Sequence, residues 1–149
     1  MSSPHRTRLG IVAVAVVGIA VSAYLTWVHY SGSLALCVGV GGCETVQASR
    51  YADIGPLPVA ALGLAGFIAI AAVAASRLRS DPPAWTLTVL FTMALAGTLY
   101  AAYLTYLELF VIGAVCPWCV TVALGSTLVL MLTTRELRAG WSERGPATR

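Results

Sequence analysis

The sequence predicts an all-α integral membrane protein, a bundle of four transmembrane helices with a short amphipathic helix in the first exterior loop. Of its 149 residues, 58% are hydrophobic and only 10% are charged, a composition too apolar for a water-soluble domain. The apolar residues lie in long blocks rather than in an alternating or helical pattern. A helix of about 20 residues crosses a bilayer core of about 30 Å. We therefore expect one domain that spans the membrane.

Four blocks are long enough to cross, and none carries a charged residue near its middle. They run roughly over residues 9–28, 57–76, 84–106 and 113–133. In the second block, Gly63 and Gly66 suit close contact between helices, which small residues favour inside a bilayer. The first block follows two arginines, as a signal peptide would. Its apolar core is longer than a usual signal core, so we expect it to remain as a helix.

The arginines predict how the helices are oriented. The N-terminal tail, the link between the second and third blocks and the tail over residues 134–149 are basic, whereas the loop over residues 29–56 and the last link are not. Positively charged segments stay on the cytoplasmic side of a membrane. Both termini are thus expected in the cytoplasm, and the 29–56 loop is expected outside an inner (plasma) membrane.

The exterior loop contains two cysteines, Cys37 and Cys43, with three glycines among the five residues between them. Glycine lets the chain turn sharply, so the two thiols can meet in disulfide geometry. A ring this small stabilises weakly, by about 2–3 kcal/mol in the loop-entropy model. Such a disulfide is better suited to thiol exchange than to support, with a structural staple as the alternative.

After these cysteines, residues 44–53 are expected to form a short amphipathic helix on the membrane surface, ended by Gly55 and Pro56. This helix carries Ser49, which faces either solvent or, turned inward, the thiols; the sequence leaves both open. His29, where the loop begins, is favoured as an interfacial anchor over a proton acceptor.

The strongest chemical motif is Cys116-Pro117-Trp118-Cys119, at the exterior end of the last block. Proline fixes φ and lacks an N–H, so Pro117 suits the first position of a helix and Cys116 the N-cap. A thiolate there faces unpaired N–H groups and the positive end of the helix dipole, which lower its pKa. The pair can close into a disulfide and pass electrons on. A zinc site would need a second Cys or His pair at similar spacing, so no metal site is expected, and two ordinary buried cysteines are the structural alternative.

All four cysteines fall on the predicted exterior face, where disulfides persist. Their order and spacing, with Ser49-Arg50-Tyr51 between the pairs, resembles the bacterial branch of the vitamin K epoxide reductase family. The resemblance extends roughly from the first cysteine to Ser126. It implies that Cys116 and Cys119 are the active-site pair, with Cys119 nearer a bound quinone, and it places Ser49 beside that site. The loop pair, Cys37 and Cys43, would be a shuttle.

The resemblance also implies a reaction. An exported thioredoxin-like partner would give electrons to Cys37, Cys43 would exchange with Cys116, and Cys119 would reduce a membrane quinone of the menaquinone, ubiquinone or vitamin K type. Disulfide formation in exported proteins would follow. Vertebrate members place a tyrosine and an asparagine near the quinone where this chain has Ala123 and Val59. These two positions are therefore expected beside the quinone, and plain quinone reduction is favoured over epoxide reduction.

Several alternatives remain at this point. Tyr100, Tyr103 and Tyr106 share one face of the third block, where an aromatic belt is favoured over the wall of a quinone pocket. Another bacterial family of quinone-linked thiol oxidases has its CxxC pair first in the chain, so the order here argues against it. A different class of function is a non-enzymatic metal carrier, or a scaffold with structural disulfides. Nucleic-acid binding has no support, because the arginines are explained by topology.

Overall fold

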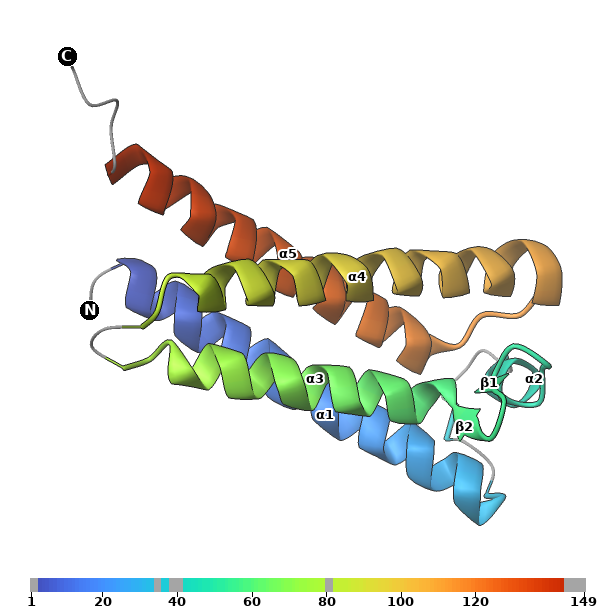
Figure 1. Ribbon diagram of the computed structural model, residues 1–149. Coiled ribbons are helices and arrows are strands. Elements are labelled where there is room, and N and C mark those ends of the chain that lie inside the picture. The colour runs from blue at the N-terminus through green and yellow to red at the C-terminus, as the bar shows by residue number, and fades with distance from the viewer. Residues whose placement is uncertain (1–2, 34–35, 38–41, 80–81, 144–149) are drawn as a thin grey trace.

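The computed structural model describes residues 3–33, 36–37, 42–79 and 82–143. Four long helices, α1 (Ser3–Ser31), α3 (Val59–Ser76), α4 (Trp85–Leu107) and α5 (Pro117–Glu143), form a bundle (Figure 1). The short elements α2 (Cys43–Gln47), β1 (Asp53–Ile54) and β2 (Leu57–Pro58) gather at one end of it. The start of α1 and the end of α5 lie at the opposite end. The predicted four-helix bundle is confirmed.

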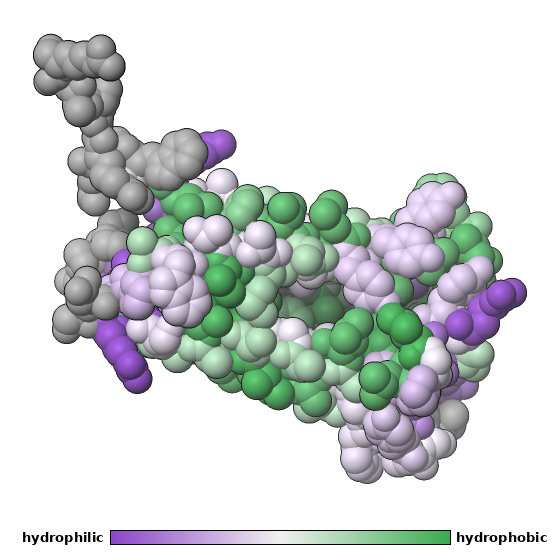
Figure 2. Space-filling model, in the orientation of Figure 1, coloured by the Kyte–Doolittle hydropathy of each residue, from purple (hydrophilic) through white to green (hydrophobic). Residues whose placement is uncertain are grey.

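The long helices are apolar over lengths that cross a bilayer. These lengths are His5–Ser31, Val59–Ser76, Trp85–Ile112 and Pro117–Gly140. Much of the surface between the two ends is hydrophobic (Figure 2), and large apolar side chains such as Val17, Leu62 and Leu124 are exposed there. A helix satisfies its own backbone hydrogen bonds and so tolerates lipid around it. The chain is a multi-pass membrane protein.

Some helix ends differ from those expected from hydropathy, and the backbone explains why. Leu57–Pro58 pairs with Asp53–Ile54 in an antiparallel hairpin, so α3 begins only at Val59. After α4 the chain continues as a π-helix, η1 (Glu108–Ile112). Gly113 ends it with φ of +69°, a left-handed conformation that glycine adopts without strain. For this reason α5 begins at Pro117 rather than at Gly113.

The surface helix expected over residues 44–53 is shorter than predicted, because α2 ends at Gln47. The Ser49 hydroxyl donates a hydrogen bond to the Val46 carbonyl oxygen at 2.7 Å, and the Ala52 N–H donates to the Ser49 carbonyl oxygen at 3.0 Å. Such local bonds compete with a continuing helix and turn the chain instead. Two further predictions, the glycine turn over residues 38–41 and the end of the tail over 144–149, lie outside the described residues.

The helices pack unevenly. α1 packs against α3 and α5, and α4 packs against α5, whereas α3 and α4 contact each other much less. The close approach of α1 and α3 depends on Gly18, since a Cβ there would lie only 2.5–2.6 Å from atoms of the Phe67 ring. Gly66 and Gly97 have no neighbour within 4 Å where a Cβ would be. Gly66, expected to serve close helix contact, therefore leaves open space on α3 instead.

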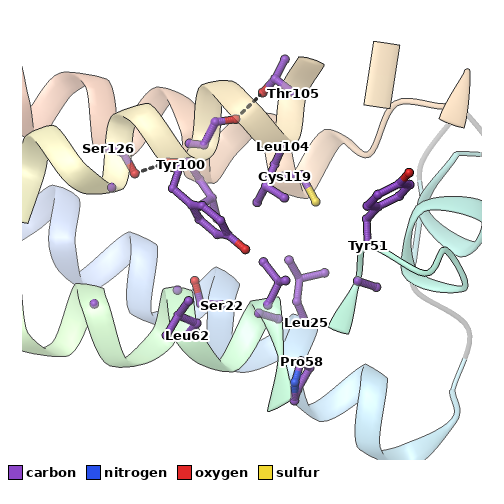
Figure 3. Close-up of a pocket in the computed structure, with 18 of the residues that line it drawn as sticks. Ser22, Leu25, Tyr51, Pro58, Leu62, Tyr100, Leu104, Thr105, Cys119 and Ser126 are labelled. Carbon is purple, nitrogen blue, oxygen red and sulfur yellow. Dashed lines mark hydrogen bonds between the residues drawn. The ribbon is translucent and has the colours of Figure 1, made fainter. Parts of the chain in front are cut away.

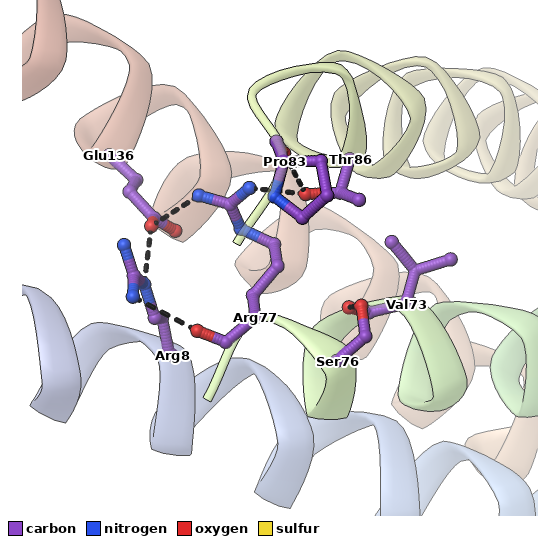
Figure 4. A network of polar contacts seen from close by, with 7 residues as sticks. All are labelled: Arg8, Val73, Ser76, Arg77, Pro83, Thr86 and Glu136. Carbon is purple, nitrogen blue, oxygen red and sulfur yellow. Dashed lines mark hydrogen bonds and ion pairs between the residues drawn. The ribbon is translucent and has the colours of Figure 1, made fainter. Parts of the chain in front are cut away.

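A cluster of charged and polar groups ties the four helices together at the end that carries the termini (Figure 4). Glu136 Oε1 of α5 accepts bonds from Arg8 Nε of α1 at 2.7 Å and from Arg77 Nη2, just after α3, at 2.8 Å. Arg77 Nη1 also donates to the Thr86 hydroxyl of α4 at 2.6 Å. Arg8 and Arg77 thus pair with a buried carboxylate, a role that the charge count alone did not predict.

Candidate active site

The loop cysteines form a disulfide, Cys37–Cys43, with 6.3 Å between their Cα atoms. Cys43 is fully buried, while Cys37 is half-buried. Gly42 lies directly against the backbone of Val115, where a Cβ would overlap the Val115 carbonyl and amide atoms. Only glycine fits so close a backbone contact. The contact brings the loop disulfide to the segment that leads into the CxxC motif.

Side chains from two helices hold the loop just before Cys37. The Trp118 indole Nε1 donates to the Leu36 carbonyl oxygen at 3.0 Å, and the Leu36 N–H donates to the Tyr24 hydroxyl at 2.9 Å. The Tyr24 and Trp118 rings also pack together, with centroids 5.3 Å apart. Both backbone groups of Leu36 are therefore satisfied by side chains, which positions the loop over the start of α5. We call this arrangement the Leu36 clamp.

The second pair, Cys116 and Cys119, lies at the start of α5 as the sequence predicted. Pro117 is the first residue of this helix, and the Cys116 carbonyl oxygen accepts the Val120 N–H at 3.0 Å. Both thiols are free, with Cys116 fully buried and Cys119 partly exposed. Cys116 belongs to one buried cluster with Cys43 and Val28, against which Cys37 and Cys119 pack. All four cysteines thus come together at one end of the bundle.

The surroundings of Cys116 favour its thiolate. A hydrogen bond from the Cys119 side chain is the largest influence, and it lowers the pKa of Cys116 from its ordinary value of 9.0 to about 7. Burial and the nearby Glu108 carboxylate act in the opposite direction, whereas the backbone N–H groups of Cys119 and Trp118 lower the pKa further. These N–H groups belong to the first turn of α5, where no helical carbonyl is available to them. Cys116 is therefore a reactive thiol near neutral pH.

A buried carboxylate accompanies this pair. Glu108 is only 4% exposed, and its Oε2 accepts the Cys116 N–H at 3.1 Å. The Cys119 thiol also interacts with this carboxylate, so its single proton can be donated either to Cys116 or to Glu108. Glu108 is the first residue of the π-helix η1, a local element that often occurs at functional sites. In the sequence alone, Glu108 is simply the one charged residue of a short link between two apolar blocks.

A cavity of about 510 Å³ lies under the CxxC motif, between α3 and α4 and against α1 and α5. Its walls are mainly apolar side chains. Figure 3 shows the Cys119 sulfur directed toward the cavity and the Tyr100 hydroxyl reaching into it. Glu108 also lines the cavity, whereas Cys116 does not. Of the two CxxC thiols, Cys119 is the one that a molecule in this cavity would contact.

The structure places the other expected site residues as follows. Ser49 and Val59 line the cavity together with Cys119, while Ala123 is not among its lining residues. The three tyrosines of α4 have different surroundings: Tyr100 lines the cavity, whereas Tyr103 and Tyr106 are exposed. Ser49, left open between two orientations, therefore lies on the inner side of its loop.

His29 also lines the cavity, and its Nε2 lies 3.2 Å from the Asp53 carboxylate. Gln47 contributes a further polar group that sequence reasoning missed. Its Nε2 is buried without a hydrogen-bond partner among the described residues, and Gln47 belongs to the cavity wall. Within the part of the chain that the structure describes, no three His, Cys, Asp or Glu side chains gather where they could hold a metal ion.

The geometry agrees with a comparison against known families. The model of the vitamin K epoxide reductase family matches residues 9–134. This match covers most of the chain, including the four long helices, both cysteine pairs, η1 and the cavity between α3 and α4.

Proposed function

Because the chain belongs to the vitamin K epoxide reductase family, whose members are oxidoreductases, we propose that it is a membrane thiol oxidase that reduces a quinone. Electrons enter at Cys37 and Cys43, pass to Cys116 and Cys119, and leave to a membrane quinone. The family supports a redox function in disulfide chemistry, and the geometry supports this order of the two pairs. One observation carries the proposal: Cys43 and Cys116 share a buried cluster, and Cys119 faces an apolar cavity on the other side.

The cavity residues fit a quinone ring. Ligand cavities usually have volumes of about 300–1,000 Å³, apolar walls and a few polar groups, and this one has about 510 Å³. A quinone carbonyl needs hydrogen-bond donors, and the buried Gln47 Nε2 has no partner within the described protein. Cys119, Ser49 and Val59 would lie beside the ring, and Tyr100 would cover it. When bound, a quinone accepts two electrons and two protons and so leaves the CxxC pair as a disulfide.

The chain's own residues account for the thiol steps. The Cys43 sulfur of the reduced loop pair attacks the Cys116–Cys119 disulfide at Cys116, giving a mixed disulfide and a free Cys119 thiol. Cys37 then attacks Cys43, which releases Cys116. Cys116 leaves readily, because the hydrogen bond from Cys119 stabilises its thiolate. The Leu36 clamp holds the loop where this exchange takes place.

The electron donor is proposed to be a thioredoxin-like protein outside the membrane, since Cys37 is the loop cysteine that is partly exposed. We place the cysteine end of the bundle on the periplasmic or extracellular face of the inner (plasma) membrane, with both termini in the cytoplasm. The arginines of the opposite end support this orientation. Quinones of the menaquinone, ubiquinone or vitamin K type all offer the ring that the cavity requires.

The test is quinone reduction by the purified protein in detergent, with a reduced thioredoxin-like protein as donor. We expect turnover in the wild type and none in Cys116→Ala. We further expect Cys43→Ser to lose oxidation of the protein donor but to keep oxidation of a small dithiol that reaches Cys119 through the cavity. A folded wild type that reduces none of the three quinone types would overturn the proposal in favour of a metal carrier or a disulfide-bonded scaffold.

A further inference from the structure

Glu108 is a buried acid that forms no ion pair with any residue that the structure describes. The ion pairs among the described residues are Arg8–Glu136, Arg77–Glu136 and His29–Asp53, and none of them includes Glu108. Placing a carboxyl group among apolar helices costs free energy, and ionisable groups at membrane depth usually serve ion or proton movement. Helix packing and the hydrogen bond from the Cys116 N–H do not explain an ionisable group, because a neutral amide side chain would fill the same space and still accept this bond.

The π-helix fixes where the carboxyl group lies. η1 begins at Glu108, and the Glu108 carbonyl oxygen accepts the Ala114 N–H at 3.1 Å, beyond Gly113 where the chain leaves the helix. The side chain is thereby held between the end of α4 and the start of α5. One oxygen accepts the Cys116 N–H, and the carboxylate can accept the single proton of the Cys119 thiol when that proton is not donated to Cys116.

Glu108 and Cys119 both line the cavity. A carboxylate that contacts a reacting thiol and the same enclosed space is placed to move a proton between them. We propose that Glu108 is a catalytic residue of the quinone-side step, where it removes the proton of the Cys119 thiol as this sulfur reacts and delivers the proton to a quinone oxygen. This inference rests on the proposed function and assigns the proton path within it.

The step balances as follows. The Cys119 S–H bond breaks, and the Cys116 S–H bond breaks too unless that thiol is already ionised; one S–S bond forms between Cys116 and Cys119, and two electrons go to the quinone, whose two oxygens become hydroxyls. Glu108 carries the Cys119 proton to one of these oxygens. The second proton comes from the Cys116 thiol or, where that thiol is already ionised, from water. Glu108 returns to its carboxylate form at the end of the cycle.

The first test needs no quinone. In Cys116→Ala with the loop disulfide intact, Cys119 is the single free thiol, and its rate of alkylation by N-phenylmaleimide, which is apolar and suits the cavity, is measured. Adding Glu108→Gln keeps an acceptor for the residue 116 N–H but removes the base. We expect the rate to fall by about 100-fold, the usual minimum for general base catalysis. Glu44→Gln, on the exposed face of α2, is the matched control and should leave the rate unchanged.

A purely structural or electrostatic role predicts the opposite sign. Removing a negative charge beside a thiol favours its ionisation, so the double variant with Glu108→Gln would then react as fast as Cys116→Ala alone or faster, and the proposal would be overturned. Glu108→Asp provides a second variant, because it keeps the carboxyl group on a shorter side chain. It should react faster than Glu108→Gln, and a rate equal to or below that of Glu108→Gln would also count against the proposal.

The second test uses quinone turnover and separates the two proposals. With the wild type active, Glu108→Gln should lower kcat by about 100-fold with little change in the KM for quinone. Its loop pair should still exchange disulfides with the donor protein at the wild-type rate. Wild-type kcat in Glu108→Gln would overturn the role of Glu108 alone, whereas an inactive wild type would overturn the proposed function itself.

Discussion

The two thiols of the CxxC motif lie in different surroundings although only two residues separate them. Cys116 is fully buried beside Cys43 and receives hydrogen bonds from the first turn of α5. Cys119, in the first turn of the helix, faces the cavity, and its single thiol proton can be donated to either Cys116 or Glu108. The helix start therefore gives one thiol to the loop pair and the other to the ligand space. This division lets a short motif connect two separate reactions.

The pKa of Cys116 gives a prediction for pH. In Cys37→Ala/Cys43→Ala, which retains only the CxxC thiols, the ultraviolet absorbance of thiolate should rise with a first midpoint at about pH 7. Because the lowered pKa favours the charged form, about a tenth of Cys116 is ionised at pH 6 and about nine tenths at pH 8. Adding Cys119→Ala removes the main hydrogen bond, so the midpoint should move toward 9. An unchanged midpoint would show that Cys119 is not the cause.

The positions of both thiol pairs in the fold could be predicted from the sequence, because local chemistry determines them. The cysteine spacings and Pro117 predicted two thiol pairs and the start of α5, because both depend on neighbouring residues. Glu108 was missed because its importance comes from a π-helix and from a contact eight residues along the chain. Its position at the end of a long apolar block was the available signal.

At the level of elements, short segments rather than the long helices align the two cysteine pairs. Gly42 brings the loop against Val115, Gly113 ends η1, and the Leu36 clamp joins the loop to α1 and α5. Hydropathy cannot predict these features, since they depend on a close backbone contact, on single side-chain hydrogen bonds and on the conformation of one glycine. The same limit explains why α2 was expected to be longer, because the Ser49 side chain ends it through a local bond.

The Leu36 clamp can be tested through Trp118→Phe, which keeps an aromatic ring against Tyr24 but removes the indole N–H. One lost hydrogen bond costs about 1 kcal/mol, so electron transfer from the donor protein to quinone should slow by about fivefold. Oxidation of a small dithiol through Cys119 should not change, since the cavity does not depend on the clamp. Trp85→Phe, an exposed tryptophan on α4, is the control and should leave both rates unchanged.

Equal slowing by Trp118→Phe of electron transfer from the donor protein and of small-dithiol oxidation would contradict this role of the clamp. Such an outcome would mean that Trp118 supports the whole start of α5. Intact Cys37–Cys43 disulfide in the variant, measured by thiol labelling, would show that the loop itself is still formed.

At the scale of the whole molecule, the two ends of the bundle have different tasks. One end contains all four cysteines and the part of the cavity wall that Cys119 forms. The other contains the cluster of Arg8, Arg77, Thr86 and Glu136. The four-helix architecture was predictable, because bilayer thickness determines the length of each apolar block. The pairing of the helices was not, since lipid-facing and buried surfaces have nearly the same composition in a membrane.

Glu136→Ala tests how much the cluster contributes to stability. It leaves the buried Arg77 guanidinium and the partly exposed Arg8 guanidinium without their carboxylate, so the free energy of unfolding in detergent should fall by about 3–5 kcal/mol. Glu44→Ala removes an exposed glutamate and should change it by no more than about 0.5 kcal/mol. Equal, small changes in both variants would show that the cluster does not hold the helices together. Turnover per folded molecule should remain at the wild-type level, because the cluster lies at the far end.

The sparse contact between α3 and α4 affects how a quinone would reach the cavity. Small residues leave the gap open, and a hollow between these helices is visible at the surface (Figure 2). Under the proposed function, a quinone enters sideways from the bilayer, and its long hydrocarbon tail stays among the lipid chains while the ring lies under Cys119. The enzyme then binds quinone that diffuses within the plane of the bilayer. Its saturation therefore depends on the mole fraction of quinone in the lipid rather than on any concentration in water.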